Sequence, residues 1–143
     1  MKATYFSTVL CAVAAATTAL ALSVAPANAA QLDQFVTPSG NIGCLVGPHG
    51  AVCEIRDHSY AQPAVPANCH GAYGDVFSEQ DGAFAQINCH TDQPVDFHSR
   101  VVDYGQQVRQ GTLACNVTTR FVECADGSTG HGFTLAREFY SVY

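Results

Sequence analysis

A histidine between two glycines, His131, is the residue whose setting most favours chemistry. The glycines at positions 130 and 132 let the backbone expose or sharply orient the imidazole, which can then act as a general base or a ligand. A hydrolase would also need a nucleophile and an orienting acid, and Ser128 and Asp126 stand nearby in the same turn-rich segment. The alternative is that the glycines serve the turn and that His131 hydrogen-bonds to the backbone.

The motifs of common enzymes are absent from the sequence. It contains neither G-x-S-x-G nor H-E-x-x-H, and Ser39 lies in a Pro-Ser-Gly-Asn segment that is typical of a turn. There is no C-x-x-C, which disfavours a redox role. We therefore expect a non-enzymatic binding module, with a small secreted hydrolase that uses His131 as the alternative. The sequence predicts no cofactor.

A second group of chemically capable residues falls within one nine-residue segment. His90, Asp92, Asp96 and His98 offer imidazole and carboxylate groups, which bind zinc and similar ions. Their order matches no standard metal site. A His/Asp metal-binding protein is therefore a further alternative rather than the expected function.

Aromatic residues provide the means of binding in a chain without tryptophan. An exposed, rigid aromatic side chain can anchor a sugar, a peptide or a protein partner. The alternative is that most of these side chains fill the core. The candidates are Tyr60, Tyr73, Tyr104, Phe133, Phe139, Tyr140 and Tyr143.

Residues 1–29 have the features of a secretory signal peptide. Lys2 supplies the positive charge, an apolar run follows, and residues 27–29 form an Ala-x-Ala cleavage site. A transmembrane anchor is the competing interpretation, because the apolar run is long enough to span a bilayer, and Cys11 loosely fits a lipidation site. The Ala/Thr-rich composition favours the signal peptide. We expect residues 30–143 to form a single secreted domain, extracellular or in the cell envelope.

The charge of that domain restricts its partners. Without Lys2 it carries five arginines against twelve acidic residues, a net charge of −7 with neutral histidines. Nucleic acids and anionic membranes need a basic surface, so both are disfavoured as partners. We expect a monomer that binds an unknown extracellular or envelope ligand and that has no membrane contact after cleavage.

Six cysteines remain after removal of the signal peptide, an even number that predicts disulfides in an exported chain. Six cysteines allow fifteen pairings. Local geometry favours Cys44–Cys53, Cys69–Cys89 and Cys115–Cys124.

Two of these pairs lie in similar hairpins. A two-residue loop at Pro48-His49 would place Cys44 opposite Cys53, at a non-hydrogen-bonded site where Cα atoms approach to about 4.5 Å. The same count from Thr119-Arg120 pairs the cysteines of residues 111–124. Proline cannot adopt the positive φ of a primed turn, and Thr119-Arg120 suits one poorly. We therefore expect a four-residue loop or a bulge in each hairpin.

The remaining chain shows short strands and Gly-rich turns without sustained helical periodicity. Strands are expected at 75–79, 83–89, 106–108 and 133–137, with irregular connections at 56–68 and 91–103. Residues 138–143 fit a strand or a short helical turn. The sequence thus predicts an all-β, disulfide-stapled sandwich or partly open barrel built from hairpins.

Several segments together resemble a family of small, exported, uncharacterised actinobacterial proteins. The matching segments are residues 37–44, 53–55, 104–105, 115–124 and 129–137, with Tyr140. The resemblance implies secretion, disulfides and a shared fold. It implies no activity and supplies no catalytic residue.

Overall fold

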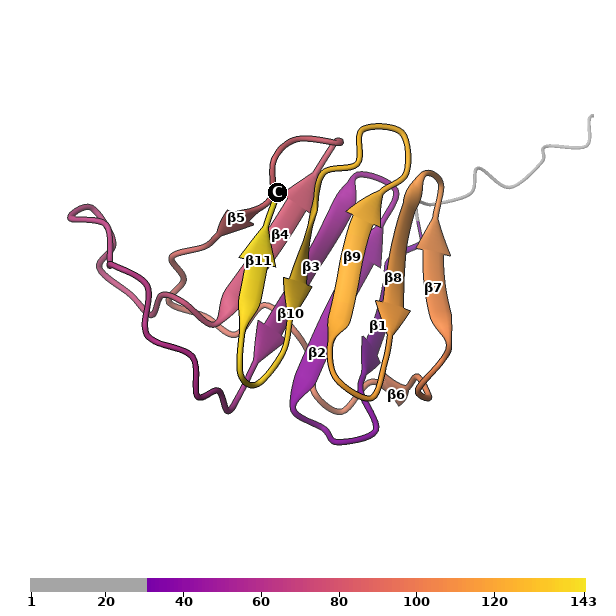
Figure 1. Cartoon of the computed structure of the whole chain (residues 1–143), viewed down its shortest axis with the longest axis horizontal. Helices are drawn as coiled ribbons and strands as arrows, with labels where there is room; N and C mark the ends of the chain where they lie inside the picture. Colours follow the sequence, from indigo (N-terminus) through magenta and orange to yellow (C-terminus); the bar gives the residue numbers. More distant parts are fainter. Residues whose placement is uncertain (1–30) are drawn as a thin grey trace, which may run out of the picture.

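The computed structural model describes residues 31–143, which form a sandwich of two β-sheets (Figure 1). One sheet has six strands in the order β5-β4-β3-β2-β1-β6, and the other has five in the order β11-β10-β9-β8-β7. The described residues contain no helix that could cross a membrane. The sheets do not close into a barrel, so the predicted all-β sandwich is confirmed.

Eight of the nine strand pairings join consecutive strands in antiparallel fashion. The exception is β6, which runs parallel to β1 at the edge of the larger sheet. The strands are Asp33–Val36 (β1), Ile42–Gly47 (β2), Gly50–Ile55 (β3), Val76–Gln80 (β4), Gln86–Ile87 (β5), Arg100–Val101 (β6), Gln107–Gln110 (β7), Leu113–Val117 (β8), Val122–Asp126 (β9), Gly132–Leu135 (β10) and Tyr140–Val142 (β11).

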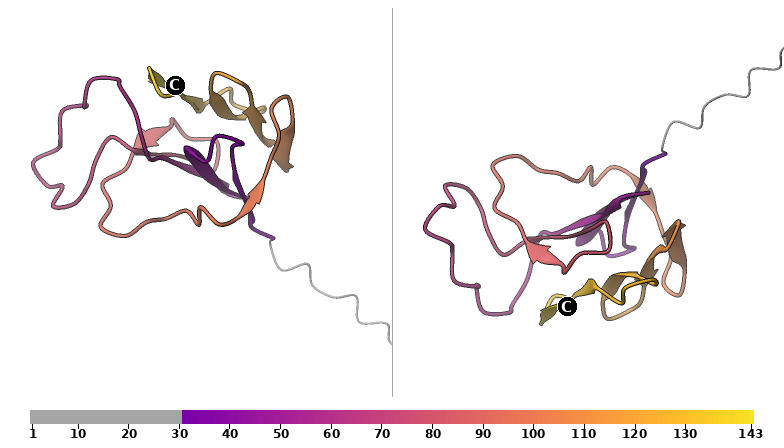
Figure 2. Two further views of the ribbon diagram at one scale, coloured as in Figure 1. Left: turned by 90° about the horizontal axis from the view of Figure 1, so that it is seen from below. Right: turned by 90° about the horizontal axis from the view of Figure 1, so that it is seen from above.

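The core lies between the sheets and follows from the alternation along each strand. In β8, Leu113, Cys115 and Val117 are buried while the residues between them are partly exposed. Phe77 and Phe133 face each other across the two sheets with ring centroids 6.2 Å apart, and both are fully buried. Figure 2 shows the sheets as two separate layers.

All three predicted disulfides are confirmed: Cys44–Cys53, Cys69–Cys89 and Cys115–Cys124. The first staples β2 to β3 in one sheet, and the third staples β8 to β9 in the other. Their sulfurs meet in the centre of the core, where Sγ of Cys53 and Sγ of Cys124 lie 3.7 Å apart. The two crosslinks therefore form a continuous sulfur cluster between the sheets.

The loop predicted for the first hairpin is wrong. Gly47 pairs with Gly50, so Pro48 and His49 form a two-residue loop with no bulge. Neither loop residue has a positive φ, because Gly50 takes one instead, with φ 151°. No residue with a side chain fits at position 50, since a Cβ on Gly50 would lie 2.2 Å from the carbonyl oxygen of Glu79.

The second hairpin has the predicted four-residue loop, at residues 118–121. The Thr118 amide donates to the Phe121 carbonyl at 2.9 Å. The Phe121 amide donates in turn to the Thr118 side-chain oxygen rather than to a backbone carbonyl. Cys115 still faces Cys124, as counted from the sequence.

The long connections differ most from the sequence prediction. Strand β6 lies within residues 91–103, which were expected to be irregular, and β5 is shorter than the strand expected at 83–89. The segment before β6 covers the outer face of the larger sheet: Val95 is buried there, and a Cβ on Gly43 would lie 2.7 Å from its Cγ1. The final residues form a strand, not a helical turn. The predicted signal peptide, residues 1–29, and Cys11 lie outside the described residues.

Candidate ligand-binding site

The loops of the sandwich gather at two opposite ends (Figure 1), and His131 belongs to the loop between β9 and β10, at one of these ends. Its Nδ1 donates to the Gly82 carbonyl oxygen at 2.6 Å, and its ring stacks on Phe84 with centroids 4.0 Å apart. The imidazole is therefore bound to the backbone, which is the alternative that the sequence left open. Its role as a catalytic base stays a prediction.

The residues expected to assist His131 are engaged with one another. One carboxylate oxygen of Asp126 accepts hydrogen bonds from the backbone amides of Ser128 and Thr129 and from the Ser128 hydroxyl, and the other accepts from Thr112. The hydrogen bonds from Ser128 and Thr112 lower the pKa of Asp126 to about 2. Ser128 thus donates to Asp126, and the group acts as a cap for the loop between β9 and β10.

The four candidate metal ligands separate into two places. His90 Nε2 lies 3.0 Å from Asp75 Oδ1 and its Nδ1 lies 3.0 Å from the Asp92 carbonyl oxygen, whereas Asp96 pairs with His98 at 3.2 Å. In residues 31–143, no three of the four place donor atoms within 4.8 Å of one another. The one such group there is Cys44, Cys53 and Cys124, whose sulfurs are already in disulfides.

Two buried glutamates were not singled out from the sequence. Glu54 on β3 is 8% exposed and Glu79 on β4 is 2% exposed, and each has one carboxylate oxygen without a hydrogen-bond partner. Burial raises the pKa of both carboxyl groups. Alternation would have flagged Glu79, because it shares the inward face of β4 with Phe77.

Replacing Glu79 with glutamine is expected to stabilise the protein at neutral pH. Folding raises the pKa of Glu79 above its ordinary value of 4.5. Between the unfolded and the folded pKa, the folded state therefore binds more protons than the unfolded state, and the free energy of unfolding falls as pH rises through this interval. Glutamine removes this cost, which we expect to be about 1 kcal/mol at about pH 8 and smaller at about pH 4. Urea unfolding at both pH values measures it, with the exposed Glu138→Gln as control; equal gains at both pH values would contradict this explanation.

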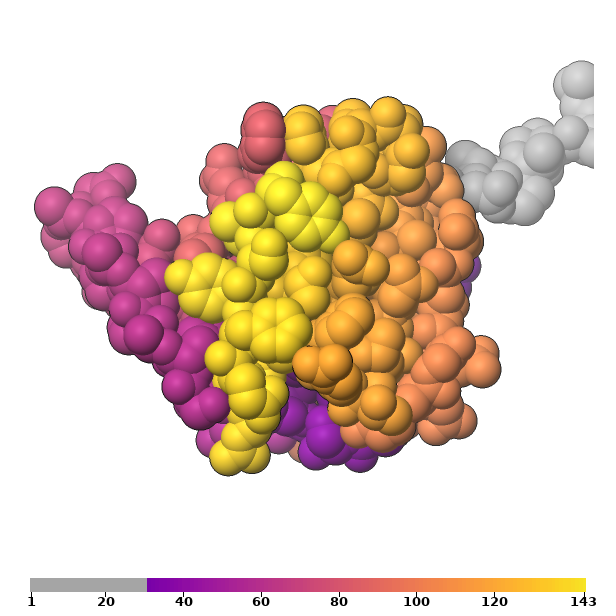
Figure 3. Space-filling view, in the orientation of Figure 1, coloured from indigo at the N-terminus to yellow at the C-terminus, as the bar shows by residue number. Residues whose placement is uncertain are grey.

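The opposite end of the sandwich holds a pocket of about 800 Å³, in the upper part of the range for small-molecule sites. Its walls come from five segments that are distant in sequence: residues 37–42, 56–57, 104, 118–121 and 137–139. Three of these are loops, between β1 and β2, between β8 and β9, and between β10 and β11. Figure 3 shows this end as the lower edge of the molecule, where yellow and orange atoms stand in front of purple ones.

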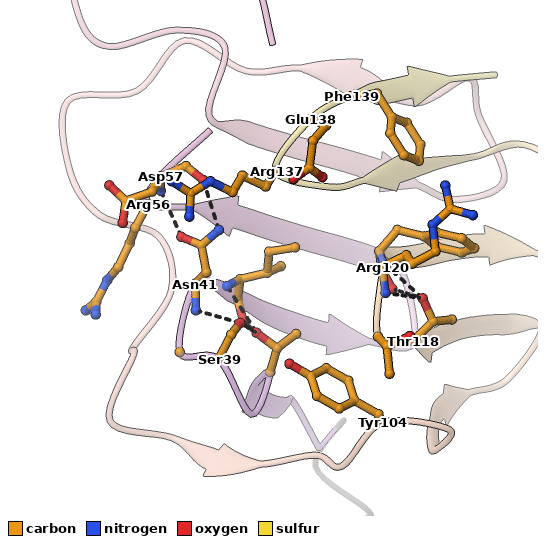
Figure 4. A pocket seen from close by; sticks show the side chains of 15 residues that line it. Ser39, Asn41, Arg56, Asp57, Tyr104, Thr118, Arg120, Arg137, Glu138 and Phe139 are labelled. Atoms are coloured by element: carbon orange, nitrogen blue, oxygen red, sulfur yellow. Dashed lines mark hydrogen bonds between the residues drawn. The ribbon is translucent and has the colours of Figure 1, made fainter. Parts of the chain in front are cut away.

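The backbone of the pocket is held by its own hydrogen bonds. Thr37 Oγ1 lies 3.0 Å from Ser39 Oγ and donates to the Ile42 carbonyl at 3.2 Å. The Asn41 side chain exchanges two hydrogen bonds with the backbone of Asp57, at 2.9 and 2.8 Å, and so ties the loop after β1 to the segment after β3 (Figure 4). These small polar residues therefore shape the walls of the pocket.

The charged side chains of the pocket are not paired with one another. Three of the five arginines in residues 31–143 line it, together with Asp57 and Glu138, and none of these five takes part in an ion pair in that part of the chain. The pocket thus has a net charge of +1, while the rest of the described chain has −8. The three arginines are Arg56, Arg120 and Arg137.

The arginines lie on different walls. Arg56 is held at one edge, where its guanidinium lies 3.8 Å from the centroid of the Phe97 ring. In Figure 4, Arg137 extends toward Asn41, and Arg120 rises from the wall on the other side. Glu138 points its carboxylate into the space between them.

Aromatic side chains complete the pocket. Tyr104 and Phe139 are 42% and 39% exposed, and Phe139 packs edge-on against Phe121 with centroids 6.4 Å apart. Figure 4 shows Tyr104 pointing its hydroxyl toward Ser39. Of the predicted aromatic anchors, Tyr104 and Phe139 reach this site, whereas Phe133 fills the core.

The comparisons with known proteins place the chain in a family but give no activity. Residues 14–143 match the family described as "Family of unknown function (DUF6636)". No curated protein and no solved structure matches the chain. The match agrees with the resemblance to an uncharacterised family, and the exported, actinobacterial character of that family stays a prediction.

Proposed function

We propose that this chain, which belongs to the family of unknown function DUF6636, is a non-enzymatic binding module whose ligand occupies the end pocket. The proposal rests on the arginines without ion pairs in residues 31–143 and the half-exposed aromatic side chains around a pocket whose loops are held by internal hydrogen bonds. A preformed concave site with few, well-placed polar groups is the usual form of a ligand site. No histidine and no cysteine lines the pocket, and its acidic residues are Asp57 and Glu138.

The compartment belongs to the same proposal. Three disulfides in 113 described residues favour an oxidising environment, outside the cell or in its envelope. We propose that the chain is exported after removal of residues 1–29 and acts as a monomer on an extracellular or envelope ligand.

The test uses the full chain, produced through an oxidising export pathway with its own leader, on an array of oligosaccharides and acidic peptides. We expect the array to retain ligands. We expect Tyr104→Ala combined with Phe139→Ala to lower their signal by about tenfold, because truncating aromatic anchors that a ligand covers costs binding most. The control is Phe84→Ala with His131→Ala at the other end, which should leave the signal unchanged. The proposal would be contradicted if the control pair lowered the array signal as well, or if the array retained no ligand at all.

A further inference from the structure

The charge balance of the end pocket indicates what it binds. A guanidinium presents two parallel N–H donors that match a carboxylate, and Arg120 and Arg137 are both available for such a bond because neither forms an ion pair within residues 31–143. Asp57 and Glu138 line the same space and would repel a densely charged polyanion. The pocket therefore suits an isolated carboxylate in an otherwise neutral ligand.

The remaining lining suits a ring that carries hydroxyl groups. Tyr104 and Phe139 offer aromatic surface for an apolar ring face. The carboxylates of Asp57 and Glu138 can accept hydrogen bonds from hydroxyls, and the Tyr104 and Thr119 hydroxyls can donate or accept. This alternation of donors, acceptors and flat apolar surface matches a pyranose.

The position of the pocket disfavours a peptide. Extended peptides commonly add a strand to an exposed sheet edge, where free backbone groups pair with them. This pocket lies at the ends of strands, and its turns use their backbone groups internally: Thr37 N donates to the Ile42 carbonyl, and Ala136 N donates to the Phe139 carbonyl, each at 2.9 Å. Recognition here must come from side chains.

We propose that the end pocket binds a carboxylated saccharide, with the carboxylate on Arg137 and the ring against Tyr104 and Phe139. This inference rests on the proposed binding function and adds the class of ligand. Arg137 is the residue that distinguishes the acidic sugar from its neutral counterpart, because its side chain extends from the loop after β10 toward the wall formed by Asn41 and Asp57 (Figure 4).

The test compares an oligosaccharide that carries a single galacturonate residue with its methyl ester, in which the one carboxylate is replaced by a neutral ester. Binding to the full exported chain is measured by titration calorimetry. We expect the acidic oligomer to bind about tenfold or more tightly than the ester, and Arg137→Gln to remove that difference, since a hydrogen bond to a charged group is worth about a tenfold change or more. Arg109→Gln, an exposed arginine on β7, is the matched control and should preserve the difference.

Arg137→Gln leaves the fold in place for this comparison. The carbonyl of Arg137, not its side chain, accepts the hydrogen bonds from Ser59 N at 2.7 Å and from Ser59 Oγ at 3.3 Å. The thermal midpoints of Arg137→Gln and Arg109→Gln should therefore agree with that of the unaltered protein.

Each other outcome overturns the inference in a recognisable way. If acid and ester bind equally and Tyr104→Ala removes the binding of both, the pocket does not recognise the carboxylate, but the proposed binding function stands. Binding of an otherwise neutral peptide that carries one glutamate, without binding of the galacturonate oligosaccharide, would show that the ligand is not a saccharide. Binding that no pocket variant weakens would overturn both the inference and the proposed function.

Discussion

Replacing Cys44 alone by alanine is expected to yield two disulfide isomers, whereas replacing Cys44 and Cys53 together should yield one. In the single variant the Cys53 thiol lies beside Cys124, because their sulfurs are 3.7 Å apart. Its thiolate can attack Cys124 Sγ, so that a Cys53–Cys124 bond forms, the Cys115–Cys124 bond breaks, and Cys115 leaves as the thiolate. The double variant has no thiol at this place.

Both variants should also lose about 2 to 5 kcal/mol of unfolding free energy, the usual cost of removing a native disulfide from a small domain. Peptide mapping without reduction identifies the isomers, and urea unfolding measures the loss. A single variant that retains only the Cys115–Cys124 bond would show that the sulfur cluster does not exchange. A loss below about 1 kcal/mol would show that the staple is dispensable.

Phe77→Ala is expected to destabilise the protein by about 3 to 5 kcal/mol, the range for emptying a buried phenylalanine site. Phe77 is fully buried and packs against Phe133 of the facing sheet and against Tyr140, whose ring centroids lie 6.2 and 5.2 Å from its own. The loss is a large part of the about 5 to 15 kcal/mol that holds an ordinary domain folded.

Phe84→Ala is the matched control for this change. The same side chain is removed, but Phe84 is 68% exposed and stacks on the ring of His131. We expect it to cost about 0.5 kcal/mol or less. Similar unfolding midpoints in urea for the two variants would mean that the interface between the sheets is not the core of this protein.

The hairpins and their disulfides were predictable because they depend on residues close in sequence. Counting outward from Pro48-His49 gave the facing cysteines, and the pairing of Gly47 with Gly50 confirms that count. The loop type was predicted wrongly, because the positive φ falls on Gly50 and not on either loop residue. A glycine directly after the turn was the available signal.

Strand β6 was not predictable, because two exposed residues, Arg100 and Val101, carry no alternation. Their pairing with β1 depends on where the preceding segment packs, with Val95 over Gly43. That contact joins residues more than fifty positions apart, which local patterns cannot show.

The candidate site was predicted only in part for the same reason. Tyr104 and Phe139 were recognised as possible anchors by residue type, but nothing local to Arg56, Arg120 or Arg137 indicates that all three line one pocket. Their convergence follows from the sandwich, which brings the loops after β1, β8 and β10 to one end. His131, the most suggestive residue in the sequence, lies at the other end.

The most direct test of the account is to map binding by the amide NMR shifts of the labelled protein during titration with the oligosaccharide that the array retains most strongly. We expect shifts in residues 37–42, 118–121 and 137–139, and none in residues 81–84 and 127–131 at the opposite end. Shifts centred on His131 and Gly82 would contradict it, and would place the ligand at the end that we assign to structure alone.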